Sequence, residues 1–305
     1  MDRRALAHGV YPTMITPFTA AGGIDWAGLD RLVDWYLERG AKGLFAVCGS
    51  SELDALTLDE RFALCERVAA RAAPHPVVAS GTFGGPLPLQ AGDCRRMVEA
   101  GARAAVILTG NLAVGEESDD TWRARLGELM DLTAPIPLGF YERPGPNNRA
   151  IPPGTLGELA RTGRFLFHKD TTCDLELIGA KAAAVAGTPL GFYNANASSL
   201  LHSLRAGGAG FSGIAASFYP DLIGWLCTFW DEEPDLAKSV QDIITALEPA
   251  IGHHYPLSAK IHLRGLGLEP ICRVEREVPS ASDLRTLEAA LAVADRVRKD
   301  LGLAS

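Results

Sequence analysis

The chain has 305 residues, of which 47% are hydrophobic and 22% charged, with 29 Lys and Arg against 37 Asp and Glu and a formal net charge of −8. This acidic balance argues against a nucleic-acid partner and against a basic membrane-surface role. No apolar run approaches the ~20 residues of a membrane-spanning helix, and residues 1–13 lack the apolar core of a secretory signal. The cysteines are scattered without C-x-x-C pairs, so we expect reduced thiols, a cytoplasmic location and neither a disulfide scaffold nor a zinc finger.

Short apolar runs typical of buried strands recur along most of the chain. They begin near residues 10, 43, 77, 104, 136, 165, 188 and 209. The segments between them have helical periodicity, for example at Leu29, Leu32, Val33, Tyr36 and Leu37, which share one helix face. This alternation predicts parallel βαβ units.

The number of βα units favours an α/β fold, a (β/α)8 TIM barrel, which typically needs about 250 residues. Continuous apolar strands are also typical of a parallel sheet that is covered on both faces. A doubly wound open sheet is the alternative, although it usually has fewer strands. After residue 215 the alternation stops, and residues 217–251 and 281–301 have only helical patterns. We therefore predict a barrel over residues 1–225 and a C-terminal helical extension over residues 226–305.

The catalytic groups of such a barrel lie where its strands end. Lys169 follows the apolar run Phe165-Leu166-Phe167 at the end of the sixth predicted strand. Burial lowers the pKa of a lysine from about 10.4, and the neutral amine is the form that attacks carbonyl carbons. The alternative is a structural lysine paired with Asp170, but alternation along a strand points Asp170 to the other face.

Two more strand ends carry polar groups that suit carbonyl chemistry. Tyr141 ends the fifth predicted strand, next to the strand of Lys169, where a phenol can relay protons. It can equally be an ordinary aromatic residue at the barrel rim. The turn Gly49-Ser50-Ser51 offers hydroxyl and N–H groups to a carboxylate, or serves only as a helix cap.

Two further patterns carry weaker signals. Residues 208–213 match G-x-G-x-x-G, but they lie in the eighth unit instead of the first strand–helix turn expected of a dinucleotide-binding fold. His253, His254 and His262 lie in the helical region, where adjacent residues point to different sides of a helix. We expect no chelate there, no metal site and no cofactor.

Taken together, these residues resemble the dihydrodipicolinate synthase / N-acetylneuraminate lyase family of class I aldolases. Residues 48–52 (C-G-S-S-E) resemble its carboxylate-binding G-[ST]-[ST]-G-E turn, and residues 141–144 (Y-E-R-P) resemble its Y-N-x-P. Residues 167–170 resemble the segment around its Schiff-base lysine, and residues 210–213 its G-x-x-S segment. The resemblance implies catalytic roles for Lys169 and Tyr141. It implies substrate binding by Gly49, Ser50, Ser51 and Ser212.

The chain departs from this family at substrate-specific positions. Gly49 replaces the first hydroxyl of the turn and Ser51 its second glycine. Leu112 stands where the synthase has a tyrosine that reaches a neighbouring subunit, and Pro146 stands near the position of a substrate-binding arginine. The remaining departures are the displaced arginines Arg143 and Arg149 and the strand-seven segment Asn194-Ala195-Asn196. These differences argue against a true dihydrodipicolinate synthase.

The resemblance implies a Schiff-base lyase, aldolase or dehydratase acting on pyruvate or a 2-keto-3-deoxy sugar acid. Three alternatives stay open. They are a catalytically impaired barrel that binds 2-oxo acids as a regulatory or binding protein, dihydrodipicolinate synthase itself, and a nicotinamide dehydrogenase that uses residues 208–213. We also expect a homo-oligomer, a dimer or tetramer, with Leu112 exposed at an interface.

Overall fold

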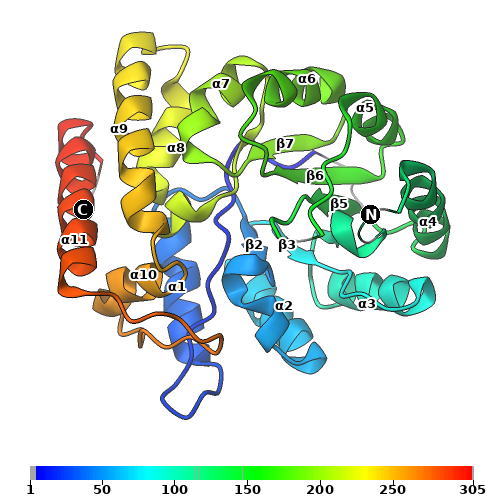
Figure 1. Ribbon diagram of the computed structural model, residues 1–305, viewed down its shortest axis with the longest axis horizontal. Coiled ribbons are helices and arrows are strands. Elements are labelled where there is room, and N and C mark those ends of the chain that lie inside the picture. Colours follow the sequence, from blue (N-terminus) through cyan, green and yellow to red (C-terminus); the bar gives the residue numbers. More distant parts are fainter. Residues whose placement is uncertain (1–4, 114, 116, 146, 304–305) are drawn as a thin grey trace.

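The chain folds as a parallel barrel (Figure 1). The computed structural model describes residues 5–303 except residues 114, 116 and 146. The 8-stranded sheet has the order β1-β8-β7-β6-β5-β4-β3-β2. Its strands are β1 (Gly9–Val10), β2 (Leu44–Ala46), β3 (Val77–Ser80), β4 (Ala104–Leu108), β5 (Leu138–Tyr141), β6 (Phe165–Asp170), β7 (Gly191–Asn194) and β8 (Gly210–Phe211). The Lys42 amide donates to the Val10 carbonyl at 2.9 Å and the Met14 amide to the Phe45 carbonyl at 3.0 Å, which brings β1 against β2. The predicted (β/α)8 fold is confirmed.

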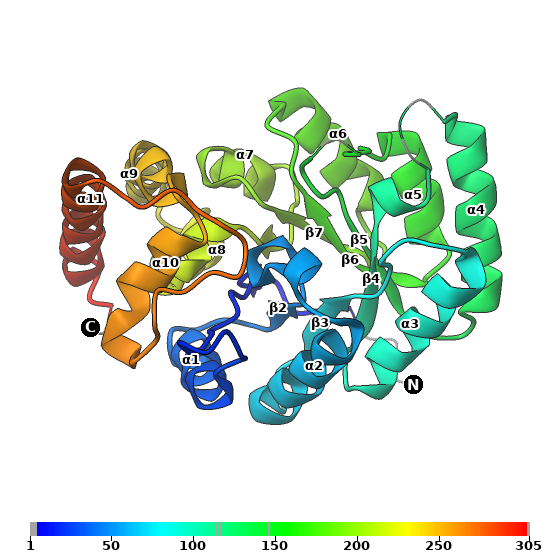
Figure 2. The ribbon, with the colours of Figure 1, turned by 60° about the horizontal axis from the view of Figure 1, so that its bottom comes forward.

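The helices that follow the strands cover the outside of the barrel (Figures 1 and 2). They are α1 (Trp26–Glu38), α2 (Leu58–Ala72), α3 (Leu87–Glu99), α4 (Asp119–Leu132), α5 (Pro153–Arg161), α6 (Leu175–Val185), α7 (Leu200–Arg205) and α8 (Pro220–Phe229). Local sequence sets their ends. The Thr57 hydroxyl accepts from the Glu60 amide and the Glu60 carboxylate accepts from the Thr57 amide, a capping box that starts α2.

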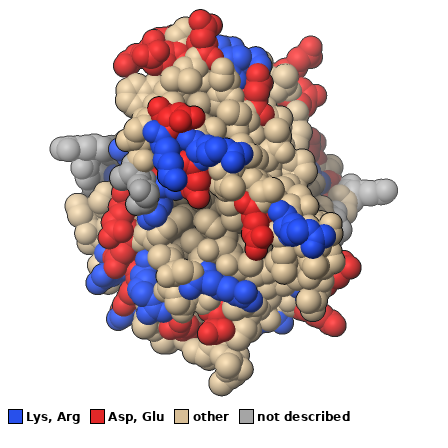
Figure 3. All heavy atoms as spheres, turned by 90° about the vertical axis from the view of Figure 1, so that its left-hand side faces the viewer, with Lys and Arg blue, Asp and Glu red and all other residues tan. Residues whose placement is uncertain are grey.

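Three further helices follow, α9 (Pro234–Gly252), α10 (Leu257–His262) and α11 (Ala281–Asp300). Helices α9 and α11 pack against α8 and against each other, and α10 packs against α9 (Figure 2). Ile244 of α9 and Leu287 of α11 are buried in the same apolar core as the strands, so these helices are part of one packed unit. Residue 225 lies inside α8, and the division of the chain at that point stays a prediction. Among the described residues, no helix is long and apolar enough to cross a membrane. Acidic and basic side chains are interspersed over the face that carries α9 and α11 (Figure 3).

Aromatic rings fill the barrel interior beneath the carboxyl ends of the strands. The rings of Tyr11 and Tyr193 lie 4.8 Å apart, those of Phe167 and Tyr193 4.9 Å, and those of Phe45 and Phe167 5.3 Å, measured between centroids. All four residues are fully buried. Because side chains alternate along a strand, Phe167 shares the inner face of β6 with Lys169. The interior therefore provides an apolar floor below that lysine.

The glycine-rich run at residues 208–213 has a packing role at the barrel seam. Gly210 adopts φ +149°, and a Cβ there would lie 1.9 Å from the carbonyl oxygen of Gly9 on the paired strand. A Cβ on Gly213 would lie 2.0 Å from the carbonyl oxygen of Ala195. Glycine is thus required because backbones approach closely, which accounts for the motif without a bound phosphate.

Candidate active site

Lys169 lies at the carboxyl end of β6, inside the barrel mouth, and its residue is 5% exposed. Its Nζ atom lies 4.3 Å from the centroid of the Tyr141 ring and 5.7 Å from that of Phe45. Within the described part of the chain, no carboxylate forms an ion pair with this ammonium. Asp170 binds Lys181 instead, so the structural pairing of Lys169 with its neighbour does not occur.

The surroundings of Lys169 favour its neutral form. Burial lowers the pKa of Lys169 from 10.5 to about 8, the Cys48 thiol opposes this change, and the positive charge of Arg143 adds to it. Desolvation penalises an ammonium because the apolar walls replace its hydration shell. Lys169 therefore carries a substantial neutral fraction near neutral pH, which a nucleophilic amine needs.

A buried charge network on the outer face of the same strand holds β6 in place. Lys181 of α6 donates to both oxygens of Glu142, at 2.9 and 2.7 Å, and to Asp170 at 2.7 Å. The Nε2 atom of His168 lies 3.1 Å from Glu142, and all four side chains are at most 1% exposed. This network ties the ends of β5 and β6 to α6 and fixes the direction of the lysine between His168 and Asp170. Although Glu142, His168 and Asp170 offer metal-ligand atoms within 4.8 Å of one another, the Lys181 ammonium already binds both carboxylates.

Tyr141 ends β5 and is paired in register with Lys169. Burial raises the pKa of the Tyr141 phenol well above its usual value, so the group stays protonated and can donate a proton. A Cβ placed on Gly49 would lie 3.1 Å from the Tyr141 hydroxyl oxygen. The fit beside the phenol is therefore tight, and a serine or threonine at this position would press against the Tyr141 hydroxyl.

Only two of the three residues in the turn at 49–51 are placed to bind substrate. Gly49 and Ser50 line a cavity of about 390 Å³ together with Tyr141 and Lys169. The Ser51 hydroxyl instead donates to the Met14 carbonyl at 2.7 Å and accepts from the Cys48 amide at 3.1 Å. Ser51 thus anchors the turn to the segment after β1 and does not line this cavity.

Ser212 follows β8 and is fully buried, and it does not line the cavity either. Its hydroxyl has no hydrogen-bond partner within the part of the chain that the structure describes. Its predicted contact with substrate stays a prediction.

Several residues that strand-end reasoning missed line the same cavity. They are Thr171, Ile214, Glu248, Tyr255, Pro256 and Arg276. Tyr255 and Glu248 come from the C-terminal helical region, which the rule about strand ends does not cover. The Glu248 carboxylate accepts from the Ala197 and Ser198 amides, both at 3.0 Å, so it reaches the barrel mouth from α9.

Tyr255 reaches the cavity from the loop between α9 and α10. Its hydroxyl lies 3.4 Å from Ser217 Oγ, which in turn lies 3.2 Å from the Tyr36 hydroxyl. Burial raises the pKa of Tyr255 to about 12, while the hydroxyls of Ser217, Ser50 and Thr13 act in the opposite direction. Tyr255 is therefore a neutral phenol beside the serine of the predicted turn.

Of the two arginines displaced from the family's substrate-binding position, Arg143 lies at the cavity and Arg149 does not. Arg143 lines the cavity, and its Nη1 atom donates to Asp54 at 3.1 Å. Arg149 pairs with Asp119 at 2.6 Å and does not line the cavity. Pro146 lies outside the described residues. Of the segment Asn194-Ala195-Asn196, Ala195 and Asn196 line the cavity, whereas Asn194 is buried and donates to Ser199.

The prediction that Leu112 is exposed at an interface is wrong. Leu112 is 1% exposed and belongs to the apolar cluster that contains Trp122, Leu126 and Ile151. The short helical turn at Thr109–Asn111 ends just before it, and the core takes up its side chain. Leu112 therefore contacts neither solvent nor the cavity.

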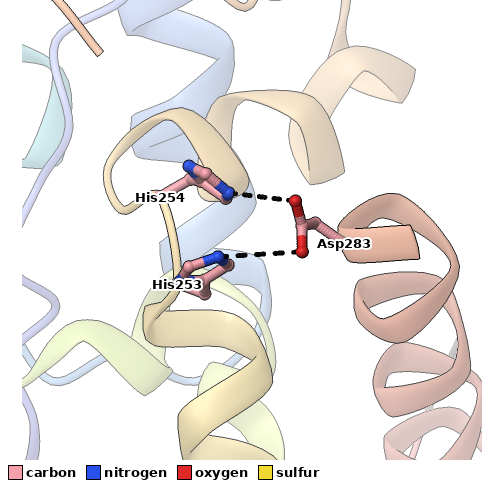
Figure 4. Close-up of side chains that lie close together, drawn as sticks. All are labelled: His253, His254 and Asp283. Atoms are coloured by element: carbon pink, nitrogen blue, oxygen red, sulfur yellow. Dashed lines mark hydrogen bonds and ion pairs between the residues drawn. The ribbon is translucent and has the colours of Figure 1, made fainter. Parts of the chain in front are cut away.

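The prediction that His253 and His254 diverge is also wrong. α9 ends at Gly252, so the pair lies beyond the helix, and His254 adopts φ +60°. The two rings lie 3.9 Å apart, and both point toward Asp283 (Figure 4). His262 lies apart from them, with its Nε2 atom 3.2 Å from the Phe218 carbonyl oxygen.

Comparison with known proteins agrees with this geometry. The sequence pattern of the Dihydrodipicolinate synthetase family matches residues 6–291. The chain belongs to this family. It is an enzyme of the class I aldolase and lyase type, whose chemistry proceeds through a Schiff base.

Relatives within the Dihydrodipicolinate synthetase family are distant. The chain is 26% identical to 4-hydroxy-tetrahydrodipicolinate synthase 1 of Streptomyces coelicolor over 298 residues, covering 95% of this chain and 93% of the relative. It is 25% identical to 4-hydroxy-tetrahydrodipicolinate synthase of Ectopseudomonas mendocina, covering 85% and 88%. At this identity the names of relatives leave the substrate of this family member open.

Solved structures of the family share its fold. Dihydrodipicolinate synthase of Acinetobacter baumannii, solved in complex with pyruvate, has a TM-score of 0.84 at 20% identity, covering 94% of this chain and 99% of that one. The prophage protein YagE of E. coli K12, also solved with pyruvate, has a TM-score of 0.84 at 19% identity, covering 95% and 99%. A monomeric variant of dihydrodipicolinate synthase has a TM-score of 0.86 at 19% identity, covering all of both chains.

Proposed function

We propose that Lys169 forms a Schiff base with a 2-oxo acid, and that the enzyme is a lyase, aldolase or dehydratase acting on pyruvate or a 2-keto-3-deoxy sugar acid. The observation that carries this proposal is the buried Lys169, without an ion-pair partner among the described residues, next to the phenol of Tyr141. A nucleophilic amine beside a neutral proton donor is the pair that imine chemistry requires.

The residues suggest the order of steps. The neutral Lys169 amine attacks the keto carbon, and the resulting carbinolamine loses water to form a protonated imine. In C–C cleavage the imine nitrogen accepts the electron pair of the C3–C4 bond while the C4 hydroxyl gives up its proton. In dehydration the imine nitrogen accepts the electron pair of a C3–H bond as that proton leaves, and the resulting enamine expels the C4 hydroxyl, which keeps the C–O electron pair, gains a proton and leaves as water. Tyr141 supplies and recovers the protons, and the turn of Gly49 and Ser50 holds the substrate carboxylate.

The remaining lining supports a substrate longer than pyruvate. Arg143 and Arg276 place positive charge at the cavity, and Thr171, Asn196 and Glu248 add hydroxyl, amide and carboxylate groups. Pyruvate is too short to use all of these groups at once. A 2-keto-3-deoxy sugar acid has the hydroxyls and the anionic charge that such a mixture of donors and acceptors binds.

Tyr255 offers a hydroxyl from the same chain. In the synthase that this chain resembles, a tyrosine of a neighbouring subunit completes the proton relay, and Leu112 has lost that group. Tyr255 lines the cavity beside Ser50, so we propose that these two hydroxyls take its place within one protomer. The proposal requires no residue from a second copy.

Reductive trapping tests the Schiff base. The protein is incubated with pyruvate and cyanoborohydride, and the intact mass and the modified peptide are measured. We expect one pyruvate adduct on Lys169, none in Lys169→Arg, and an unchanged adduct in Lys238→Ala, which removes an exposed lysine paired with Asp242. An adduct that persists in Lys169→Arg contradicts the proposal. A panel of 2-oxo acids then identifies the substrate by turnover above the Lys169→Arg background.

A second candidate is a catalytically impaired member of the family that serves mainly to bind 2-oxo acids. The lack of a side-chain hydroxyl at Gly49 favours it, because the family's relay has a hydroxyl there. Turnover of any compound in the panel, absent from Lys169→Arg, rejects this candidate. The dehydrogenase alternative predicts that NAD(H) or NADP(H) raises the Tm, and a thermal-shift measurement without any increase rejects it.

We also propose that the chain assembles as a dimer or tetramer and works in the cytoplasm. The assembly follows from the family resemblance, and the location from the scattered free cysteines. Sedimentation at micromolar concentration tests the assembly, and a monomer of 32.4 kDa contradicts it.

A further inference from the structure

Two histidines and an aspartate converge where the C-terminal helices meet (Figure 4), and none of the three lines the catalytic cavity. His253 and His254 follow the last residue of α9, and Asp283 lies in the first turn of α11. The Nε2 atom of His253 lies 3.7 Å from Asp283 Oδ1, and the Nε2 atom of His254 lies 3.3 Å from Asp283 Oδ2. The ligand atoms that the three residues offer all lie within 4.8 Å of one another.

These separations fit ligands that share one ion; the contact between His254 Nε2 and Asp283 Oδ2 at 3.3 Å is also a long hydrogen bond, whereas the His253 contact is not. Zinc binds imidazole nitrogen and carboxylate oxygen at about 2.0–2.2 Å, so two ligands at a tetrahedral angle lie about 3.3–3.6 Å apart. The pair at 3.3 Å falls at that distance, and the pair at 3.7 Å is close to it. A separation of 3.7 Å is too long for a hydrogen bond between nitrogen and oxygen.

The carboxylate is held in place before any ion binds. The Ser280 amide donates to Asp283 Oδ2 at 2.8 Å, and the Ser280 hydroxyl accepts from the Asp283 amide at 3.2 Å. This capping box fixes the orientation of the carboxylate toward the two imidazoles. Hydrogen bonds that orient a ligand in this way raise metal affinity.

Space next to the cluster allows further ligands. A cavity of about 240 Å³ adjoins the three residues and is also lined by Ser258 and by apolar groups of α9 and α11. The His253 side chain is 61% exposed and that of His254 is 7% exposed, so an ion enters from solvent and reaches a partly buried position. One or two water molecules have room to complete the coordination.

We propose that His253, His254 and Asp283 bind one divalent transition-metal ion of the zinc class. Two imidazoles and one carboxylate form a donor set that suits Zn²⁺, Co²⁺ or Ni²⁺ and not the all-oxygen preference of Mg²⁺ or Ca²⁺. The ion joins the end of α9 to the start of α11. The chain continues directly from His254 to Tyr255, so the ion also steadies the loop that carries this tyrosine into the catalytic cavity.

Metal titration tests the site directly and does not depend on the proposed substrate. The purified chain is stripped with a chelator and titrated with Zn²⁺ by calorimetry, and with Co²⁺ by visible absorption, which reports nitrogen and oxygen ligands at a four- or five-coordinate ion. We expect one ion per chain, and a Tm raised by about 4 °C at a hundredfold excess over Kd.

Variants assign the ligands. His253→Ala and Asp283→Asn each remove one ligand, and Asp283→Asn retains a side-chain oxygen for the helix cap. We expect each to weaken Zn²⁺ binding at least tenfold and to change the Co²⁺ spectrum. His75→Ala removes an exposed histidine elsewhere and serves as the matched control.

Two results overturn the proposal. One is the absence of heat, absorption change and Tm shift with millimolar Zn²⁺, Co²⁺ and Ni²⁺. The other is equal binding by His253→Ala, Asp283→Asn and His75→Ala, with circular dichroism showing that all are folded. In either case the three residues form only an ion-paired contact between α9 and the cap of α11.

Discussion

The pH dependence of imine formation is the most direct test of the environment of Lys169. With the pKa lowered to about 8, roughly one molecule in ten carries the neutral amine at pH 7. A lysine with a pKa of 10.5 carries the neutral amine in about one molecule in 3,000 at pH 7. The lowered pKa therefore raises the reactive fraction about 300-fold. This difference corresponds to about 3 kcal/mol between the two protonation states.

Reductive trapping with pyruvate over pH 6–10 measures this quantity. The carbonyl compound does not titrate in this range, so the initial rate of adduct formation follows the neutral fraction of the amine. We expect the rate to rise about tenfold per pH unit below pH 8 and to level off above it. The control is the rate of cyanoborohydride reduction of a preformed small-molecule imine, which corrects for the reagent's own pH dependence.

A rate that continues to rise up to pH 10 refutes this reasoning. Such a profile shows that Lys169 titrates like an exposed lysine and that the apolar walls from Phe45 and Tyr141 do not desolvate it. A rate that is flat from pH 6 upward also refutes a pKa of about 8. Such a profile means either that the pKa of Lys169 lies below 6 or that a step other than amine attack limits the rate.

Three further variants test separate parts of the site. Tyr141→Phe should lower kcat by about 10²–10⁴-fold with a smaller change in KM, and a change in KM alone contradicts a role in proton transfer. Arg143→Gln removes a positive charge that lowers the pKa of Lys169, so the levelling of the trapping rate should move to higher pH, and an unchanged profile contradicts that contribution. Leu112→Tyr should lower stability by about 1–3 kcal/mol in urea unfolding, because it inserts a phenol into a packed core, and wild-type stability contradicts the buried placement.

The barrel and its lysine were predictable because both follow from local pattern. Parallel strands that are buried on both faces appear as apolar runs, and the residue that ends each run lies at the mouth of the barrel. Lys169 and Tyr141 satisfy this rule, and strand alternation also separates Lys169 from Asp170 correctly. Nothing beyond the order of the strands is needed to place these two side chains side by side.

The rest of the site depends on side-chain orientations and helix packing that the sequence pattern does not predict. Ser50 and Ser51 look equivalent in the sequence, yet Ser51 turns its hydroxyl to the Met14 carbonyl. Tyr255 and Glu248 reach the cavity only because the C-terminal helices pack over one side of the barrel mouth.

The positions of His253 and His254 were also unpredictable from the sequence pattern, because they lie at the end of a helix. The helical pattern continues up to them, but α9 ends one residue before the pair. Beyond that residue the helical rule for adjacent side chains no longer applies. The change in backbone direction at His254 then brings both rings to Asp283.

The proposed partnership of Tyr255 and Ser50 leads to a prediction about non-additivity. If the two hydroxyls form one path for protons within the protomer, Tyr255→Phe and Ser50→Ala each interrupt it, and the double variant should be no slower than the slower single variant. Each single change should lower kcat by about 10²-fold or more. Trapping of the pyruvate imine should persist in all three, because Lys169 retains its surroundings.

The matched control for this cycle is Tyr219→Phe. Tyr219 is buried, its hydroxyl has no hydrogen-bond partner among the described residues, and it does not line the cavity. Its removal should leave kcat unchanged, which separates the loss of a buried phenol from the loss of the relay. Additive effects of Tyr255→Phe and Ser50→Ala would show that the two hydroxyls act independently. A wild-type kcat in Tyr255→Phe would show that Ser50 exchanges protons with solvent or with a second subunit by another route.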